Sequence, residues 1–339
     1  MFRNPAMGVT IVLVKKPGWR SAARAALYSG AAIAGAVVGT SLLVGWAIVR
    51  PNRDRRYDAL PRIRFGTLEP IDLMTSDGLR LHAWVLLSSA AAANKWVLVL
   101  HGYRSRRDVL QTRARYFSRR GFHVLLPHLR GHGSSEPARI SYGYNERNDV
   151  LAAFDFIRSL RPNEPVSIGI DGISMGAAAA AYAVGFEQMR PDWMILESCY
   201  DTIRHALANR LAVRIGRPLT PLLTWPVEMV VEQLAQLRAA DLDPGKALEN
   251  TPCPILVLAG DSERVLKTVE IEYLYGAIGG PKRLALFPGA GHEDLLMHDP
   301  RRYIRAVDGF LRDFTGWKAP HSFPYRGPDG ARYQVLPSP

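Results

Sequence analysis

The sequence predicts an α/β domain in which a mostly parallel sheet is covered by helices on both faces. Short apolar runs rich in β-branched residues recur along the chain and are typical of buried strands. Segments with apolar residues at helical spacing separate most of these runs. Strands that alternate with helices favour parallel pairing through crossover connections.

The N-terminal part precedes this alternation. Residues 1–24 form a basic segment, and the 25 residues from 25 to 49 contain no charged side chain. As a helix this run would be about 37 Å long, enough to cross a bilayer with some tilt. The apolar region of a cleaved signal peptide is shorter and precedes a small-residue cleavage site. We therefore expect an uncleaved transmembrane signal anchor, with a cleaved signal peptide as the alternative. The excess of arginine after the run favours a cytoplasmic position for the following domain.

Residues 50–68 are basic and contain prolines, which is typical of a linker. The α/β domain is expected over residues 69–315 and begins with a hairpin at residues 71–87, turned at Asp77-Gly78. Further strands are expected at Trp96–Leu100, His123–Pro127, Val166–Asp171, Trp193–Glu197, Ile255–Ala259 and Arg283–Phe287. Helices are expected at residues 107–119, 145–160, 177–184, 265–278 and 300–314.

Residues 200–245 break the alternation, because they are helical and amphipathic with a proline-rich interruption at Pro218–Pro226. They either form a cap or lid over a pocket or are connecting helices packed on the sheet. Residues 316–339 are rich in proline and glycine, and we expect a loosely ordered tail.

Residues 172–176 read Gly-Ile-Ser-Met-Gly, between an apolar run and a helix-forming run of alanines. A strand, a tight turn and a helix in this order form a nucleophile elbow, which lifts the serine hydroxyl above the sheet. The glycines let the two backbones pass closely. Ser174 is therefore a candidate nucleophile, and the N–H of Met175 is free to point at an oxyanion. An ordinary glycine-rich turn is the alternative.

Charge and cysteine content exclude other classes of function. The net charge is +12, but no nucleic-acid-binding motif is present. We expect attraction to a membrane surface and a solvated basic face, with no nucleic-acid partner. Two cysteines are too few for a disulfide framework or a structural zinc site. The glycines of residues 130–135 lack the lysine and the spacing of a phosphate-binding loop, so we expect no cofactor and no metal.

Four motifs lie at the ends of expected strands: His101-Gly102, Arg130-Gly131-His132-Gly133, the elbow and Gly291-His292. Together they resemble the α/β-hydrolase superfamily, over residues 70–315. The run Tyr-Gly-Tyr-Asn-Glu-Arg-Asn-Asp at residues 142–149 is similar to a pattern of membrane-anchored bacterial serine hydrolases of that fold. The resemblance implies an α/β-hydrolase fold, here preceded by a transmembrane helix.

The resemblance also implies a catalytic triad in the chain order serine, acid, histidine. Ser174 would be the nucleophile, and His292 would be the general base on the loop after the last strand. The oxyanion hole would consist of the backbone N–H groups of Tyr103 and Met175. The side chains at those two positions are free to vary, because only the N–H groups matter.

Two acidic residues compete for the third position of the triad. The family pattern is a glycine, two variable residues, the acid, one residue and a valine, which counted from Gly260 places the acid at Glu263. Asp261 is the alternative, with Asp201 after the preceding strand a more distant one. We expect Asp261 to cap the turn instead.

The sequence departs from the family at two other places. His128 stands where an acid is common, which should change a loop hydrogen bond and leave the chemistry intact. Cys199 stands where a proline is common.

The function expected from these features is that of a serine hydrolase anchored in a membrane, which for a bacterial protein of this kind is the inner membrane. It would cleave an ester, a thioester or a related acyl bond of a small or lipid-like substrate. A peptidase of the same fold and a non-catalytic, membrane-tethered scaffold are the alternatives.

Overall fold

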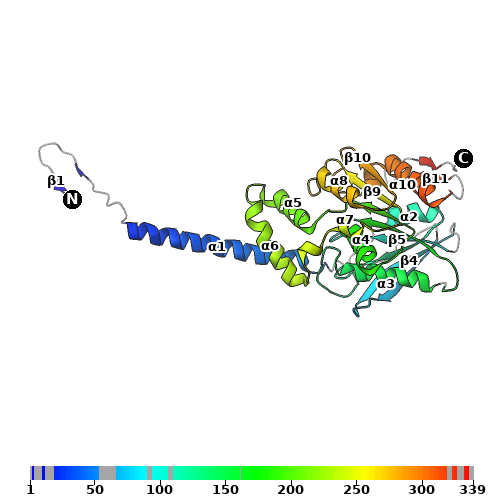
Figure 1. Cartoon of the computed structure of the whole chain (residues 1–339), viewed down its shortest axis with the longest axis horizontal. Helices are drawn as coiled ribbons and strands as arrows, with labels where there is room; N and C mark the ends of the chain where they lie inside the picture. The colour runs from blue at the N-terminus through cyan, green and yellow to red at the C-terminus, as the bar shows by residue number, and fades with distance from the viewer. Residues whose placement is uncertain are drawn as a thin grey trace.

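A mixed sheet of eight strands forms the centre of the structure (Figure 1). The computed structural model describes residues 2–3, 10–11, 19–52, 66–89, 94–105, 110–160, 162–318, 323–326 and 332–335. The order of the strands is β10-β9-β8-β7-β5-β6-β4-β3. Their bounds are β3 Gly66–Met74, β4 Arg80–Ser88, β5 Lys95–Leu100, β6 His123–Pro127, β7 Ser167–Ile173, β8 Trp193–Glu197, β9 Ile255–Gly260 and β10 Lys282–Phe287. β4 pairs antiparallel with both β3 and β6, and all other neighbouring strands of this sheet pair in parallel. The expected hairpin and the mostly parallel sheet are confirmed.

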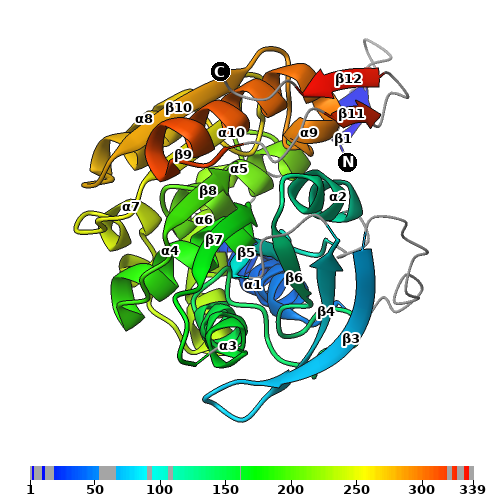
Figure 2. The same cartoon turned by 90° about the vertical axis from the view of Figure 1, so that its right-hand side faces the viewer.

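Helices cover both faces of the sheet, as expected (Figure 2). α2 (Gln111–Arg119) and α10 (Pro300–Thr315) share one hydrophobic core with one face. α3 (Glu146–Ser159), α4 (Met175–Glu187) and α8 (Thr268–Ala277) share the other. The remaining described elements are α1 Trp19–Val49, α5 Ile203–Ile215, α6 Thr220–Ala235, η2 Ala239–Asp241, α7 Pro244–Ala247, α9 Leu295–His298 and the short strands β1 Phe2–Arg3, β2 Thr10–Ile11, β11 Phe323–Arg326 and β12 Arg332–Val335.

The expected interruption at Pro218–Pro226 is shorter in the structure: it is limited to residues 216–219 between α5 and α6, because α6 begins at Thr220 and continues through Pro226. Pro221 lies in the first turn, where a missing backbone N–H costs little. Pro226 removes an internal hydrogen bond, at a cost of about 3 kcal/mol. Burial of Val227 and Val231 in the core offsets this cost, since each contributes about 1.5–3 kcal/mol.

Two other boundaries also differ from expectation. Residues 66–68 belong to β3 and not to a linker, while residues 53–65 lie outside the described part of the chain. Within the expected loose tail, β11 and β12 pair as an antiparallel hairpin. Local composition missed both features because cross-strand pairing stabilises strands that propensity alone does not indicate.

α1 is one continuous helix that projects from the globular part (Figure 1). Within it, Ala22–Val49 is long and apolar enough to cross a membrane. Its described residues from 22 to 36 are all exposed, whereas Ser41 and Val49 are buried against the domain. α6 lies beside this second half, where a Cβ on Gly45 would come within 2.4 Å of Val230.

Candidate active site

The turn between β7 and α4 holds Ser174 in a strained conformation. Its φ of 53° and ψ of −114° are unusual for a residue other than glycine. A Cβ on Gly172 would lie 2.7 Å from the Cα of Ala177, and one on Gly176 would lie 2.7 Å from the carbonyl oxygen of His101. The sequence therefore forms a tight elbow here because only glycine fits on either side of the serine.

Two hydrogen bonds connect Ser174, His292 and Glu263. The Ser174 Oγ is 3.1 Å from His292 Nε2, and His292 Nδ1 is 2.7 Å from Glu263 Oε2. These side chains come from the loops after β7, β10 and β9, so the parallel strands bring them to one edge of the sheet. The Glu263 side chain is fully buried, whereas that of His292 is 30% exposed. With its proton on Nδ1, the imidazole can accept the Ser174 proton at Nε2.

The structure brings Glu263 to His292, and it does not bring Asp261 or Asp201 there. Asp261 is exposed and accepts a 2.8 Å hydrogen bond from the backbone N–H of Gly289, which lowers the pKa of this carboxyl. Asp201 lies 2.6 Å from His205 at the start of α5. Asp261 thus stabilises the turn between two loops, as expected for an aspartate after a strand.

Ser198 is a residue of this site that sequence reasoning missed. Its Oγ donates to Glu263 Oε1 at 2.5 Å, and the N–H of Gly260 donates to the same oxygen at 3.3 Å. Because both donors bind Oε1, the other oxygen, Oε2, remains available to His292. Ser198 has a φ of 48° directly after β8. A polar residue at the carboxyl end of a strand next to the elbow was the available signal.

The loop after β5 lies against the elbow. A Cβ on Gly102 would be 3.3 Å from the Cβ of Ser174. The following residue is Tyr103, and the first residue of α4 is Met175. Within the described residues, neither of their N–H groups donates to another protein atom. Both donors are therefore available to a ligand oxygen, as the sequence leads us to expect.

His132 supports this loop from the side. Its Nε2 accepts a 3.1 Å hydrogen bond from the backbone N–H of Arg104, and its Nδ1 is 2.9 Å from the carbonyl oxygen of Arg130. Burial lowers the pKa of His132, which favours the neutral ring that this pair of contacts requires.

The two departures from the family pattern are accommodated locally. His128 Nδ1 accepts a 3.2 Å hydrogen bond from the backbone N–H of Ser134, a contact that an acid could also make. Cys199 and Cys253 are both buried and free. Burial raises the pKa of the Cys199 thiol, so this thiol stays protonated and unreactive.

A buried charge cluster lies beneath the site. The Arg113 guanidinium donates to Asp171 at 3.1 Å, to Glu197 at 2.5 Å and to Asp294 at 3.1 Å. Burial raises the pKa of Glu197 to about 8, although Arg113 opposes the shift. This cluster joins β7 and β8 to the segment that follows His292, so it holds the histidine loop over the sheet.

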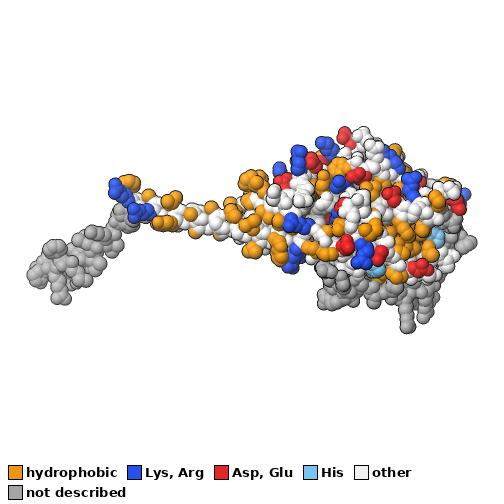
Figure 3. Space-filling model, turned by 90° about the horizontal axis from the view of Figure 1, so that it is seen from below, with side chains coloured by type: hydrophobic (Ala, Val, Ile, Leu, Met, Phe, Trp, Pro, Cys, Tyr) orange, Lys and Arg blue, Asp and Glu red, His pale blue; other side chains and the backbone are white. Residues whose placement is uncertain are grey.

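The helical hairpin of α5 and α6 stands at the same edge of the sheet as Ser174, because α5 follows the carboxyl end of β8. Figure 3 shows hydrophobic side chains continuing from α1 onto the adjoining part of the globular domain. Exposed apolar residues of the hairpin are Val213, Leu219, Leu222, Trp225 and Met229. The close approach of Gly45 to Val230 shows that the hairpin packs on α1 and not only on the sheet.

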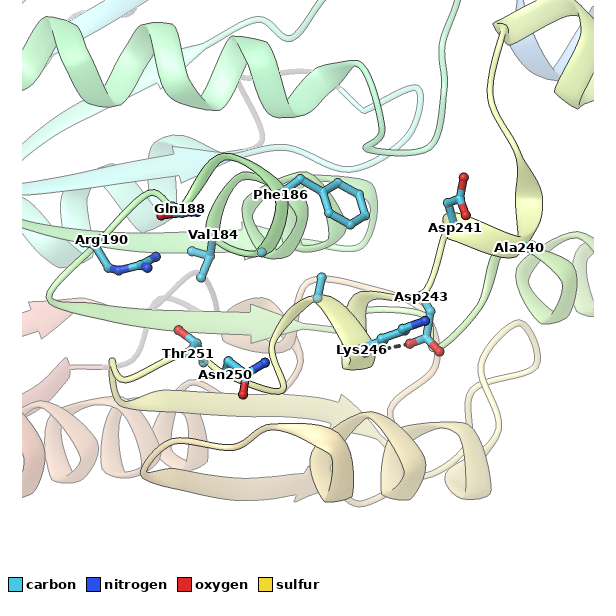
Figure 4. A pocket seen from close by; sticks show the side chains of 12 residues that line it. Val184, Phe186, Gln188, Arg190, Ala240, Asp241, Asp243, Lys246, Asn250 and Thr251 are labelled. Carbon is cyan, nitrogen blue, oxygen red and sulfur yellow. Dashed lines mark hydrogen bonds between the residues drawn. The ribbon is translucent and has the colours of Figure 1, made fainter.

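A cavity of about 480 Å³ lies beside α4 and α7, and Ser174 does not line it (Figure 4). Arg190 and Thr251 line it, and they precede β8 and β9. These two residues place one end of the cavity at the amino ends of the strands. Lys246 also lines the cavity. Its backbone N–H donates to the Asp243 side chain at 2.9 Å, and this bond caps the N-terminus of α7.

Comparison with known proteins agrees with this architecture. The family described as serine aminopeptidase, S33, matches residues 91–244. An uncharacterized protein of Mycobacterium tuberculosis is 27% identical over 242 residues, which are 70% of this chain and 77% of that protein. The α/β hydrolase domain-containing protein WAV2 of Arabidopsis thaliana is 23% identical over 300 residues, 82% of this chain and 92% of that one.

Among solved structures, an esterase of Pyrococcus furiosus is similar, with a TM-score of 0.63 and 19% identity. The match covers 79% of this chain and 100% of the esterase. The predicted fold class is thereby confirmed.

Proposed function

Because the chain belongs to the α/β-hydrolase superfamily, we propose that it is a membrane-anchored serine hydrolase that cleaves an ester, a thioester or a related acyl bond. The observation that supports this proposal most directly is the connected set of Ser174, His292 and Glu263, with contacts of 3.1 and 2.7 Å. No step needs a metal or a cofactor.

In the proposed reaction, Ser174 Oγ attacks the acyl carbonyl carbon while His292 Nε2 takes the hydroxyl proton. Glu263 accepts the Nδ1–H bond and stabilises the imidazolium that forms. The N–H groups of Tyr103 and Met175 bind the negatively charged oxygen of the tetrahedral intermediate. The imidazolium then protonates the leaving group, and the acyl group stays on Ser174. A water molecule, deprotonated by His292, releases the acyl group as a carboxylic acid and restores the serine.

We propose that α1 anchors the enzyme in the membrane. Its apolar stretch Ala22–Val49 has a mean hydropathy of 2.1 in its most apolar window. The catalytic edge faces the end of this helix, because the Tyr103 hydroxyl donates to the carbonyl oxygen of Ile48 at 2.8 Å. A bacterial inner membrane with the catalytic domain on the cytoplasmic side agrees with the distribution of arginines. A lipid-like acyl substrate would meet the site directly from the bilayer.

Peptide hydrolysis is a second candidate, because the matching family is described as a serine aminopeptidase. An aminopeptidase needs an anionic group to bind the free ammonium of its substrate. Around Tyr103, however, the charged side chains are Arg104, Arg210 and Arg214, which repel an ammonium group. Turnover of aminoacyl anilides compared with acyl esters of the same leaving-group class separates the two candidates.

Labelling with a fluorophosphonate probe tests the proposal. Full-length protein in neutral detergent should become labelled, and the Ser174→Ala variant should not. Ser262→Ala is the matched control, because Ser262 is exposed on the neighbouring loop and bonds Asp261 instead. Absence of labelling in the folded wild-type protein would favour a non-catalytic scaffold. A panel of esters with increasing acyl length then defines the substrate range.

A further inference from the structure

A small cavity lies between the membrane helix and the catalytic edge. Its volume is about 120 Å³. One wall is α1 at Val44–Ile48, and the opposite wall is α5 at Leu207–Arg214. Tyr103 and Tyr142 close it, with their rings stacked at a centroid distance of 5.2 Å. Tyr103 also supplies the proposed oxyanion donor through its backbone N–H, so the cavity and the proposed oxyanion hole share this residue.

The cavity is strongly electropositive. Arg104, Arg210 and Arg214 line it, and none of them forms an ion pair within the described residues. Two buried donors there also lack a partner among the described residues. They are the Nε of Arg104 and the hydroxyl of Tyr142, a residue that is only 1% exposed. Buried donors without an acceptor are rare in folded proteins. Oxygens of an anion would satisfy them.

The geometry of α1 places the cavity at a defined depth in a bilayer. The uncharged residues 25–36 are exposed and would cover about 18 Å, less than the ~30 Å of a hydrocarbon core. The bilayer must then extend over about eight more residues, from Val37 to Val44. The cavity beside Val44–Ile48 would thus lie where the lipid headgroups begin.

The hairpin of α5 and α6 agrees with this depth. The C-terminal end of α6 lies close to the globular domain, because the Arg139 guanidinium donates to the carbonyl oxygen of Leu234. The neighbouring N–H of Ile140 donates to the carbonyl oxygen of Val49 at the end of α1. The other end of α6 therefore points along α1, away from the body. That end exposes Leu219, Leu222 and Trp225. Apolar and tryptophan side chains of this kind suit insertion into the interfacial region of a leaflet.

We propose that this cavity binds the phosphate of a membrane lipid headgroup, and so directs the enzyme to anionic amphiphiles as acyl substrates. The inference rests on the proposed function, because it names the substrate class of the same site. Arginines suit such a group because guanidinium and phosphate form paired, charge-assisted hydrogen bonds. The tyrosine hydroxyl supplies a further donor.

Direct binding tests the proposal without requiring turnover. The full-length Ser174→Ala protein in neutral detergent is titrated calorimetrically with dioctanoyl phosphatidic acid, dioctanoylglycerol and inorganic phosphate. We expect the phosphatidic acid to bind at least about tenfold more tightly than the diacylglycerol. Replacement of Arg210 and Arg214 together by Gln should remove this preference, whereas replacement of both by Lys should retain part of it.

Arg238→Gln is the matched control, because this exposed arginine lies shortly after α6 but does not line the cavity. Equal affinity for the two lipids would overturn the proposal. An equal loss in Arg238→Gln would also overturn it, by attributing the preference to net charge. If inorganic phosphate binds as tightly as the phosphatidic acid, the proposal that the bound phosphate belongs to a lipid is wrong. If thermal melting shows that the double Gln variant does not fold, the single Arg210→Gln variant takes its place. Loss of the lipid preference in that variant supports the proposal, and an unchanged preference overturns it.

Fluorophosphonate labelling separates this inference from the proposed function. Labelled Ser174 without a headgroup preference would contradict only the inference. A headgroup preference without labelling would contradict only the hydrolase proposal.

Discussion

Replacement of Glu263 by Gln is the most informative single change to the proposed catalytic site. Oε1 of the carboxylate accepts hydrogen bonds from Ser198 at 2.5 Å and from Gly260 at 3.3 Å. The amide oxygen of a glutamine must take that position, because its NH2 group would face two donors there. The NH2 group is then left facing Nδ1 of His292, where Oε2 lies at 2.7 Å in the wild type.

The consequence is a change of tautomer. An NH2 group donates to Nδ1, so the ring proton moves to Nε2 and His292 can no longer accept the Ser174 proton. In serine proteases the corresponding substitution lowers kcat by about 10⁴-fold. A loss of this size corresponds to about 5 kcal/mol of transition-state stabilisation. Since size and packing are conserved, the fold should remain intact.

The assay compares turnover of p-nitrophenyl acetate by full-length Glu263→Gln and Asp261→Asn proteins in detergent. Asp261→Asn should change kcat by less than about threefold, because among the described residues its exposed carboxylate accepts hydrogen bonds from Gly289 and Ser262 and none from His292. A larger loss in Asp261→Asn than in Glu263→Gln would show that Asp261 orients His292 and that the argument from Gly260 spacing is wrong.

Five further outcomes are expected. Ser198→Ala should lower kcat by about tenfold, because Glu263 loses its shortest hydrogen bond; an unchanged kcat would contradict the role assigned to Ser198. Arg113→Met should lower the free energy of unfolding in urea by about 3–5 kcal/mol, because it removes the hydrogen bonds that the buried side chains of Asp171 and Glu197 accept from the guanidinium. The raised pKa of Glu197 means that the folded state keeps a proton that the unfolded chain releases, so the contribution of this group to the free energy of unfolding in urea should fall as the pH rises from 4.5 to 8. Gly45→Ile should lower the melting temperature by pushing α1 from α6, whereas Gly39→Ile, with nothing within 4 Å, should not; equal effects would argue against this packing. Carbonate-washed membranes should retain the full-length protein, and recovery of a soluble species that begins near Pro51 would instead indicate cleavage of α1.

Local sequence was sufficient for the features that depend on neighbouring residues. The elbow could be predicted because Gly172 and Gly176 flank a serine between a strand and a helix, and only a tight turn needs glycine on both sides. The parallel sheet could be predicted because buried strands are continuously apolar. The apolar run in α1 was equally visible.

Only the tertiary structure decided between the two acidic residues after β9. Glu263 and Asp261 have the same local setting, and which of them turns inward depends on the loop after β10, where Gly289 holds Asp261. The roles of Ser198 and Arg113 could not be predicted from the sequence either, because their hydrogen-bond partners are more than 50 residues away in the chain.

The same reason applies to the proline-containing helix α6 and to its packing against α1. Apolar periodicity reports that a face is buried, but it does not report what covers that face. Gly45 lies close to Val230 because the α5–α6 hairpin follows β8 at the edge of the sheet that carries Ser174, and α1 ends at the same edge. The order of the strands in the sheet, which no local pattern specifies, brought α1 and the candidate active site together.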